Sequence, residues 1–141
     1  MATQRAELPG WIADHIKSYQ ATDGADGHIW RGVPTLLLTT TGRKSGEPLL
    51  LPLIYGRDGE NFVVVASKGG APAHPAWYLN LRAHPEVQVQ VGAEKFTGRA
   101  RTATADERPR LWEAMAKIWP AYNEYQQKTR REIPVVVIER A

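Results

Sequence analysis

The sequence contains no cysteine, and this absence removes several kinds of chemistry at once. Disulfide bonds, thiolate nucleophiles and cysteine-ligated zinc are all excluded. The four histidines, His15, His28, His74 and His84, are scattered without the spacing of metal ligands, so no metal site is predicted. We therefore expect each histidine to have a structural or surface role.

Long hydrophobic runs are also missing. No window approaches the roughly 18 apolar residues that a membrane-spanning helix needs. Residues 1–7 are polar and lack the apolar core of a secretory signal. The sequence therefore predicts a cytoplasmic protein and leaves open a peripheral contact with a membrane surface.

The common catalytic motifs are absent as well. There is no Gly-x-Ser-x-Gly nucleophile elbow, no His-Glu-x-x-His motif and no Gly-x-Gly-x-x-Gly fingerprint. The charge is only mildly one-sided, with 18 Lys and Arg against 15 Asp and Glu, a formal net charge of +3. This balance suits a small anionic ligand and is too weak to indicate nucleic acid.

What the sequence does contain is one core of apolar segments, since 43% of its 141 residues are hydrophobic. Their periodicity predicts an α+β fold, a six-stranded, mostly antiparallel split β-barrel with flanking helices. The first three strands are expected to form a meander. The expected strands are 33–40, 48–57, 61–67, 86–91, 95–102 and 133–139, and the expected helices are 9–20, 74–82, 104–118 and one that restarts at Pro120.

The N-terminal segment is expected to be an appendage of the barrel. Its predicted helix, Pro9 to Gln20, is aromatic and apolar on the face from Trp11 to Tyr19. That face could pack on the barrel, on a second subunit or on a membrane. Because a Gly- and Asp-rich connector follows, we divide the chain into a helix with connector (1–27) and a barrel domain (28–141). The oligomeric state is not predicted.

The most informative stretch joins the first two strands: Thr39-Thr40-Thr41-Gly42-Arg43-Lys44-Ser45-Gly46. Its glycines permit positive φ and close approach of a ligand. Its two cations, its hydroxyls and its free N–H groups suit phosphate or carboxylate. It is not a Walker A loop, because Arg43 precedes Lys44 and the chain runs on into a strand. The alternative is an ordinary solvated turn.

Two further segments are rich in donors and flat side chains, 66–70 (Ala-Ser-Lys-Gly-Gly) and 77–80 (Trp-Tyr-Leu-Asn). With the cationic turn they suit a phosphate and a planar heteroaromatic ring. A protein of this kind binds and orients a large cofactor, and the cofactor carries the chemistry.

These segments together resemble the deazaflavin (coenzyme F420)-dependent nitroreductase family of actinobacteria, which are split β-barrel flavin/deazaflavin oxidoreductases. The resemblance covers about residues 33–139, and includes Pro52-Leu53, the motif from Trp119 to Tyr125 and Ile133-Pro134-Val135-Val136-Val137. It implies a split β-barrel, coenzyme F420 as cofactor, and hydride transfer from the reduced deazaflavin to a quinone, nitroaromatic or activated enone.

The resemblance also implies roles for individual residues. The phosphate and glutamyl tail would be held by Arg43, Lys44 and Ser45. The strand beneath the cofactor would consist of Leu49, Leu50, Leu51, Pro52, Leu53 and Ile54. A second cofactor-binding segment would consist of Val65, Ala66, Ser67 and Lys68. The short helix that completes the binding site would contribute Ala76, Trp77, Tyr78, Leu79 and Asn80. Tyr122 and Tyr125 would line the substrate pocket, with Tyr122 beside the cofactor ring as well.

A catalytic role is expected for the hydroxyl-bearing residues Tyr122, Ser67 and Tyr125. Tyr122, or Ser67 acting through water, would donate a proton or stabilise negative charge, whereas Tyr122 alternatively only packs against the ring. Two positions depart from the family pattern, Leu49 where a basic residue is frequent and Trp119 where tyrosine is common. Competing functions are a split-barrel enzyme using FMN, a deazaflavin-binding protein without turnover, and a small barrel binding single-stranded nucleic acid, which the low charge disfavours.

Overall fold

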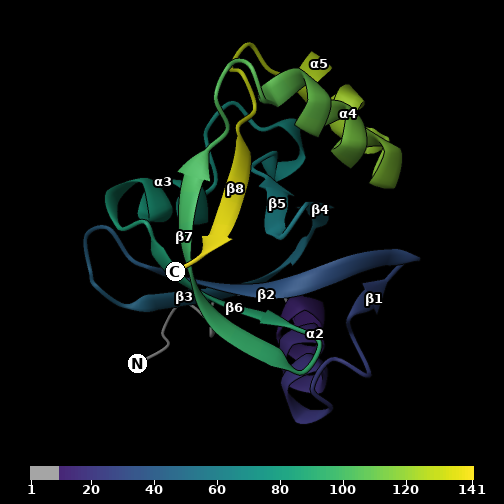
Figure 1. Cartoon of the computed structure of the whole chain (residues 1–141), viewed down its shortest axis with the longest axis vertical. Helices are drawn as coiled ribbons and strands as arrows, with labels where there is room; N and C mark the ends of the chain where they lie inside the picture. Colours follow the sequence, from purple (N-terminus) through teal and green to yellow (C-terminus); the bar gives the residue numbers. More distant parts are fainter. Residues whose placement is uncertain (1–9) are drawn as a thin grey trace.

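The computed structural model describes residues 10–141, whose strands form one curled antiparallel sheet with helices around it (Figure 1). Every strand pairing is antiparallel. The strands are β1 (Ile29–Trp30), β2 (Val33–Thr41), β3 (Pro48–Ile54), β4 (Gly56–Asp58), β5 (Asn61–Val65), β6 (Glu86–Val91), β7 (Glu94–Thr102) and β8 (Val135–Arg140). The helices are α2 (Gly10–Ala21), α3 (Ala76–Ala83), α4 (Arg108–Ile118) and α5 (Ala121–Gln127), with a single 3-10 turn, η1 (Lys68–Gly70).

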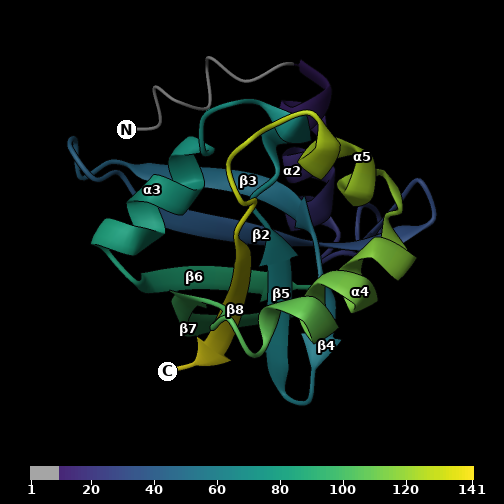
Figure 2. The ribbon, with the colours of Figure 1, turned by 90° about the horizontal axis from the view of Figure 1, so that it is seen from above.

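The strand order is β1-β2-β6-β7-β8-β5-β4, and β3 pairs with β2 beside this path. The split barrel predicted from the sequence is therefore confirmed. Helix α3 and the α4–α5 pair lie on opposite sides of the sheet (Figure 2). The strand β8 lies between β5 and β7, so the last strand of the chain completes the middle of the sheet.

The predicted second strand, 48–57, is wrong as one continuous element, because it is interrupted at Tyr55. Before this residue β3 pairs with β2, with Ile54 opposite Thr35. After it β4 pairs with β5, with Gly56 opposite Val63. The chain thus changes partners at the corner of the barrel, and the expected meander is bent there. Within residues 10–141, this interruption and the short β1 raise the number of strands from the predicted six to eight.

Several predicted boundaries also shift, and prolines explain two of them. The predicted second helix, α3 in the structure, begins at Ala76 rather than at His74, because Pro75 has an extended ψ of 150° and restricts the residue before it. The last strand begins after Pro134, at Val135. The helix expected from residue 104 begins at Arg108, and the Thr104–Glu107 pair forms the expected reciprocal hydrogen bonds ahead of it.

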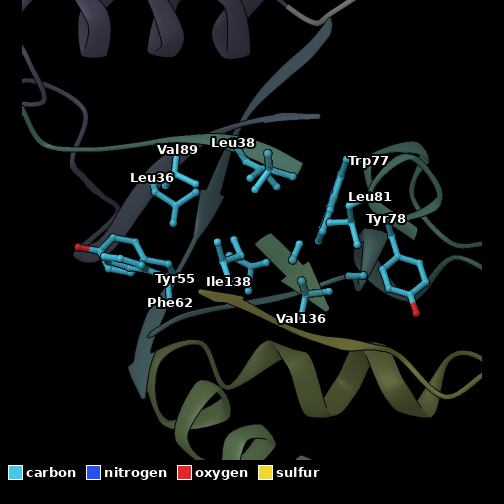
Figure 3. Packing of buried hydrophobic residues seen from close by; sticks show 14 of the residues in the cluster. Leu36, Leu38, Tyr55, Phe62, Trp77, Tyr78, Leu81, Val89, Val136 and Ile138 are labelled. Carbon is cyan, nitrogen blue, oxygen red and sulfur yellow. The ribbon is translucent and has the colours of Figure 1, made fainter. Parts of the chain in front are cut away.

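The barrel interior holds the main core, in which side chains from facing strands meet (Figure 3). Leu36 and Leu38 of β2 point into it, and Phe62 and Ile138 close it from the opposite side. Side chains alternate between the two faces of a strand, so Leu37 points outward and packs beneath α2. Each fully buried side chain of this type contributes about 1.5–3 kcal/mol to the free energy of unfolding.

A second core lies on the outer face of β5 and β8. Val63 and Val137 alternate with the inward residues and pack against Leu111 and Met115 of α4. The run of valines predicted as a buried strand is therefore buried on both faces. Helices α4 and α5 are held by this contact beside the cleft described below.

Helix α2 packs on the sheet by its predicted apolar face. Ile16 and Tyr19 are fully buried there. The Tyr19 hydroxyl accepts a hydrogen bond from the Gly92 N–H (2.8 Å) and donates to the Thr35 carbonyl (3.1 Å). Pro9, the expected helix start, lies outside the described residues, and the domain boundary at residue 27 stays a prediction.

Candidate functional site

A cleft of about 720 Å³ opens between β3, the loop after β5, and the helices α2, α3 and α5. This volume lies within the usual range of small-molecule sites, and the walls are mostly apolar and aromatic. Ser67 and Lys68 are among the few polar side chains that reach it. The cleft therefore suits a flat ligand that needs only a few polar contacts.

Strand β3 forms one wall of the cleft. Five of its six predicted cofactor residues line the space: Leu49, Leu51, Pro52, Leu53 and Ile54. Leu50 does not, because it packs with the α2 cluster. Alternation places Leu50 on the same face as Pro52 and Ile54, so its absence from the cleft reflects its cover by Ile16 and Tyr19 of α2.

The loop after β5 and the first turn of α3 form the next wall. Val65, Ser67, Lys68, Ala76 and Trp77 line it. The other predicted residues of these segments do not reach the cleft. Ala66 and Tyr78 belong to the barrel core, Leu79 packs against that core, and Asn80 is buried beneath the cationic turn.

The cationic turn lies outside the cleft and is exposed at Arg43, Lys44 and Ser45. Three hydrogen bonds with Asn80 anchor it to α3, one of them from the Arg43 guanidinium to Asn80 Oδ1 (3.4 Å). The Arg43 N–H donates to Asn80 Oδ1 (3.1 Å), and Asn80 Nδ2 donates to Thr40 Oγ1 (3.1 Å). Ser45 Oγ accepts from the Glu47 N–H within the turn (3.0 Å). Asn80 therefore joins the two cations to the helix that edges the cleft.

An aromatic wall closes the opposite side, and the sequence predicted only part of it. Trp30 stacks on Trp11 at 5.9 Å between ring centroids, and it meets Trp119 at 5.8 Å. All three line the cleft together with Tyr122 and Tyr125. Trp11 and Trp30 were missed as site residues, because they come from an expected appendage and from a two-residue strand. The aromatic face of the N-terminal helix was the signal for Trp11.

Tyr122 is buried in this wall, with its ring 6.1 Å from that of Tyr125. Burial raises the pKa of Tyr122 well above its ordinary value, and Tyr125 adds a smaller effect in the same direction. The hydroxyl therefore stays protonated at neutral pH and can donate. Its oxygen makes no hydrogen bond to any residue that the structure describes.

The donor set fits a phosphate-bearing planar cofactor. The cleft offers flat apolar walls, and the anchored turn adds two cations beside them. No group of three potential metal ligands gathers within residues 10–141. None of the helices in the same range is long and apolar enough to cross a membrane.

Comparison with known proteins shows the family of this chain. The family model described as F420H(2)-dependent quinone reductase matches residues 11–140. The chain belongs to this family. An F420H(2)-dependent quinone reductase of Mycobacterium tuberculosis (strain ATCC 25618 / H37Rv) is 42% identical over 130 residues, covering 89% of this chain and 87% of its own length.

Two solved structures extend this family relationship to the fold. A structure described as an F420-H2 dependent reductase (FDR-A) superposes with a TM-score of 0.70 at 42% identity, covering 79% of this chain and 98% of its own. A structure described as a domain-swapped dimer gives a TM-score of 0.72 at 38% identity, covering 89% and 98%. The resemblance to the deazaflavin-dependent family is thus confirmed, whereas the roles of single residues stay predictions.

Proposed function

We propose that this protein is a reductase that uses reduced coenzyme F420 to reduce a small-molecule acceptor, a quinone in the first place. The observation that carries the proposal is the apolar cleft whose edge, α3, is bonded through Asn80 to the exposed turn with Arg43 and Lys44. When bound, the coenzyme would supply a hydride from its reduced deazaflavin ring. The quinone reductases among the relatives are named for this coenzyme, which favours it over the FMN alternative.

The polar residues of the cleft and of the cationic turn would bind and orient the coenzyme. Arg43, Lys44 and Ser45 would hold the phosphate and the acidic tail outside the cleft, where their exposure leaves room for a long chain. The wall from Leu51 to Ile54 would support the ring, and Lys68 would neutralise negative charge beside it. Fixing the coenzyme and the acceptor in one orientation provides much of the rate enhancement, because the entropic cost of bringing them together is met on binding.

The aromatic wall would recognise the acceptor. Trp119 and Tyr125 present flat faces suited to stacking on a planar quinone. The protonated hydroxyl of Tyr122 would donate a hydrogen bond to the acceptor oxygen as negative charge develops on it. Nitroaromatics and activated enones are proposed as further acceptors on the same argument, since each has an electrophilic group that gains negative charge.

The test is an acceptor screen that follows the loss of absorbance of reduced coenzyme F420 with menaquinone, a nitroaromatic and cyclohexenone. Acceptor-dependent oxidation, fastest with the quinone, is the expected result. Tight coenzyme binding without turnover would identify a carrier protein instead. Ultraviolet-visible spectra of the protein mixed with FMN or with coenzyme F420 separate the two cofactors, because only the bound one shows a shifted spectrum.

A further inference from the structure

Arg131 lies in the segment between α5 and β8, and its guanidinium is surrounded by backbone carbonyls. Its Nε donates to the Ala71 oxygen (2.8 Å), one NH group to the Ala66 oxygen (3.2 Å) and the other to the Ser67 oxygen (2.7 Å). All three carbonyls belong to the loop that follows β5. Arg131 does not line the cleft, so it touches the loop from its far side.

His74 completes the surroundings of this guanidinium. Burial lowers the pKa of His74, and Arg131 and Arg82 lower it further, so the ring is neutral at neutral pH. Its Nδ1 lies 3.1 Å from Arg131 and accepts a fourth hydrogen bond. The planar guanidinium thus has a partner on every side of its fork, a geometry that lysine cannot reproduce.

These bonds fix the direction of two peptide groups. All peptide bonds in residues 10–141 are trans, so each N–H points opposite to the carbonyl of the residue before it. With the Ala66 and Ser67 carbonyls turned toward Arg131, the N–H groups of Ser67 and Lys68 point away from it. Both residues line the cleft, and neither N–H finds an acceptor among the described residues.

The backbone at these residues has the conformation of an anion-binding nest. Ser67 is in the right-handed region (φ −79°, ψ −39°), and Lys68 follows in the left-handed region (φ 47°). This alternation turns successive N–H groups into one concavity. A left-handed lysine costs about 1–3 kcal/mol and persists only where its surroundings enforce it. Arg131 contributes to that enforcement from the side away from the cleft, alongside the bonds within the loop from the Gly70 N–H to the Ser67 oxygen (2.9 Å) and from the Ala71 N–H to the Lys68 oxygen (3.1 Å).

We propose that Arg131 is a positioning residue that holds the Ser67–Lys68 backbone open toward the cleft as a donor site for an acceptor oxygen of the cofactor. The ligand part rests on the function proposed above. The oxygen belongs either to the anionic phosphate or to a carbonyl of the deazaflavin ring, and both accept hydrogen bonds from two N–H donors. Arg131 acts through the loop and has no contact with the ligand itself.

The test compares Arg131→Lys with Arg130→Lys, the same change at the neighbouring exposed position. Dissociation constants are measured by fluorescence for coenzyme F420 and for the deazaflavin ribityl alcohol, which carries neither phosphate nor tail. We expect Arg131→Lys to weaken coenzyme F420 about tenfold or more, with Arg130→Lys near wild type. If the alcohol binds as in wild type, the nest takes the phosphate, and if it weakens equally, the nest takes the ring carbonyl. An unchanged constant for coenzyme F420 in the folded variant overturns the proposal.

A second measurement keeps the inference testable if Arg131→Lys does not fold. Inorganic phosphate and, separately, the deazaflavin ribityl alcohol are titrated into the ¹⁵N-labelled wild-type protein. One of the two is expected to shift the backbone amide signals of Ser67 and Lys68 more than those of residues outside the cleft. Equal small shifts throughout with both probes would overturn the nest. If wild-type protein binds phosphate at these amides and yet does not bind coenzyme F420, the proposed function fails while the positioning role stands.

Discussion

Two loops carry the cations beside the cleft, and they are held in different ways. The turn from Gly42 to Glu47 closes on itself, since the Gly42 N–H donates to the Glu47 oxygen (2.8 Å) and the Gly46 N–H to the Gly42 oxygen (2.9 Å). The loop from Ala66 to Ala71 also has two internal bonds, from the Gly70 N–H to the Ser67 oxygen (2.9 Å) and from the Ala71 N–H to the Lys68 oxygen (3.1 Å). It is held in addition by the guanidinium of Arg131, 60 or more positions away in the chain. The first loop is exposed at its cations, and the second lines the cleft.

The difference corresponds to what each loop has to hold. A long, acidic and flexible tail needs charge more than exact geometry, and a locally closed exposed turn provides charge at little structural cost. A rigid ring in a cleft needs donors at fixed positions, which a loop alone does not keep. We therefore expect side chains from distant segments to support a loop whose donors must keep fixed positions. Hydrogen bonds within the loop should be enough where charge alone holds the ligand. Four predictions follow from this contrast, in order of decreasing effect.

Tyr122→Phe should lower turnover and spare coenzyme affinity, because Tyr122 belongs to neither loop. Removing a hydroxyl that stabilises developing charge is expected to cost about ten- to a thousand-fold in turnover on a quinone at saturating reduced coenzyme. An apolar enone, which needs the hydrogen bond less, should lose less. Wild-type turnover on both acceptors would exclude a chemical role and leave Tyr122 as part of the wall.

Gly70→Ala should destabilise the protein far more than Gly46→Ala, although both glycines have positive φ, 85° and 73°. A Cβ at Gly70 would lie 2.6 Å from the Tyr125 carbonyl oxygen, whereas none of the described atoms lies within 4 Å of one at Gly46. We expect losses of about 2–4 and about 1 kcal/mol in the free energy of unfolding. Urea unfolding measures both, and equal losses would mean that the cleft loop is not tightly packed on α5.

Lys44→Ala should weaken coenzyme F420 by about ten- to a hundred-fold, because one charge-assisted contact contributes about 1.5–3 kcal/mol. Turnover at saturating coenzyme should change little, since the charge acts outside the cleft. Lys95→Ala removes the same charge from β7 and serves as the matched control. A dissociation constant equal to that of the control would remove Lys44 from the site.

Asn80→Ala should have the smallest effect of the four. It removes the bonds to the Arg43 N–H and to Thr40, and we expect a loss of about 1–2 kcal/mol in the free energy of unfolding. Because the turn keeps its internal bonds, coenzyme affinity should fall less than in Lys44→Ala. Asn61→Ala, at the hairpin between β4 and β5, is the control. A larger loss of affinity than in Lys44→Ala would show that the turn depends on distant support after all.

Sequence reasoning was most successful where a pattern repeats. The alternation of Glu86 to Val91 and the valines of β8 predicted strands that the structure contains. It failed at Tyr55, because the apolar run from Leu49 to Tyr55 is unbroken and periodicity carries no information on the change of pairing partner. The break follows from the curvature of the sheet, which is a property of the whole barrel.

The site was predictable to the extent that its residues have a chemical signature. Glycines, cations and tryptophans in the sequence indicated a binding role for the two loops and for α3. Arg131 was missed because its partners are mainly backbone carbonyls. Every residue has a backbone carbonyl, so the sequence does not show which of them will meet an arginine. Trp30 was missed for a related reason, since only the folded arrangement brings β1 between α2 and the start of α5.

The placement of β8 also bears on how the molecule is made. Until Val135–Arg140 has been synthesised, β5 and β7 each lack a neighbour, and their unpaired backbone is open to other chains. Val136 and Ile138, which are fully buried in the finished barrel, enter the core last. The nascent protein is therefore prone to aggregate until this strand has been made, and its yield in a cell should depend on how quickly the strand pairs with β5 and β7.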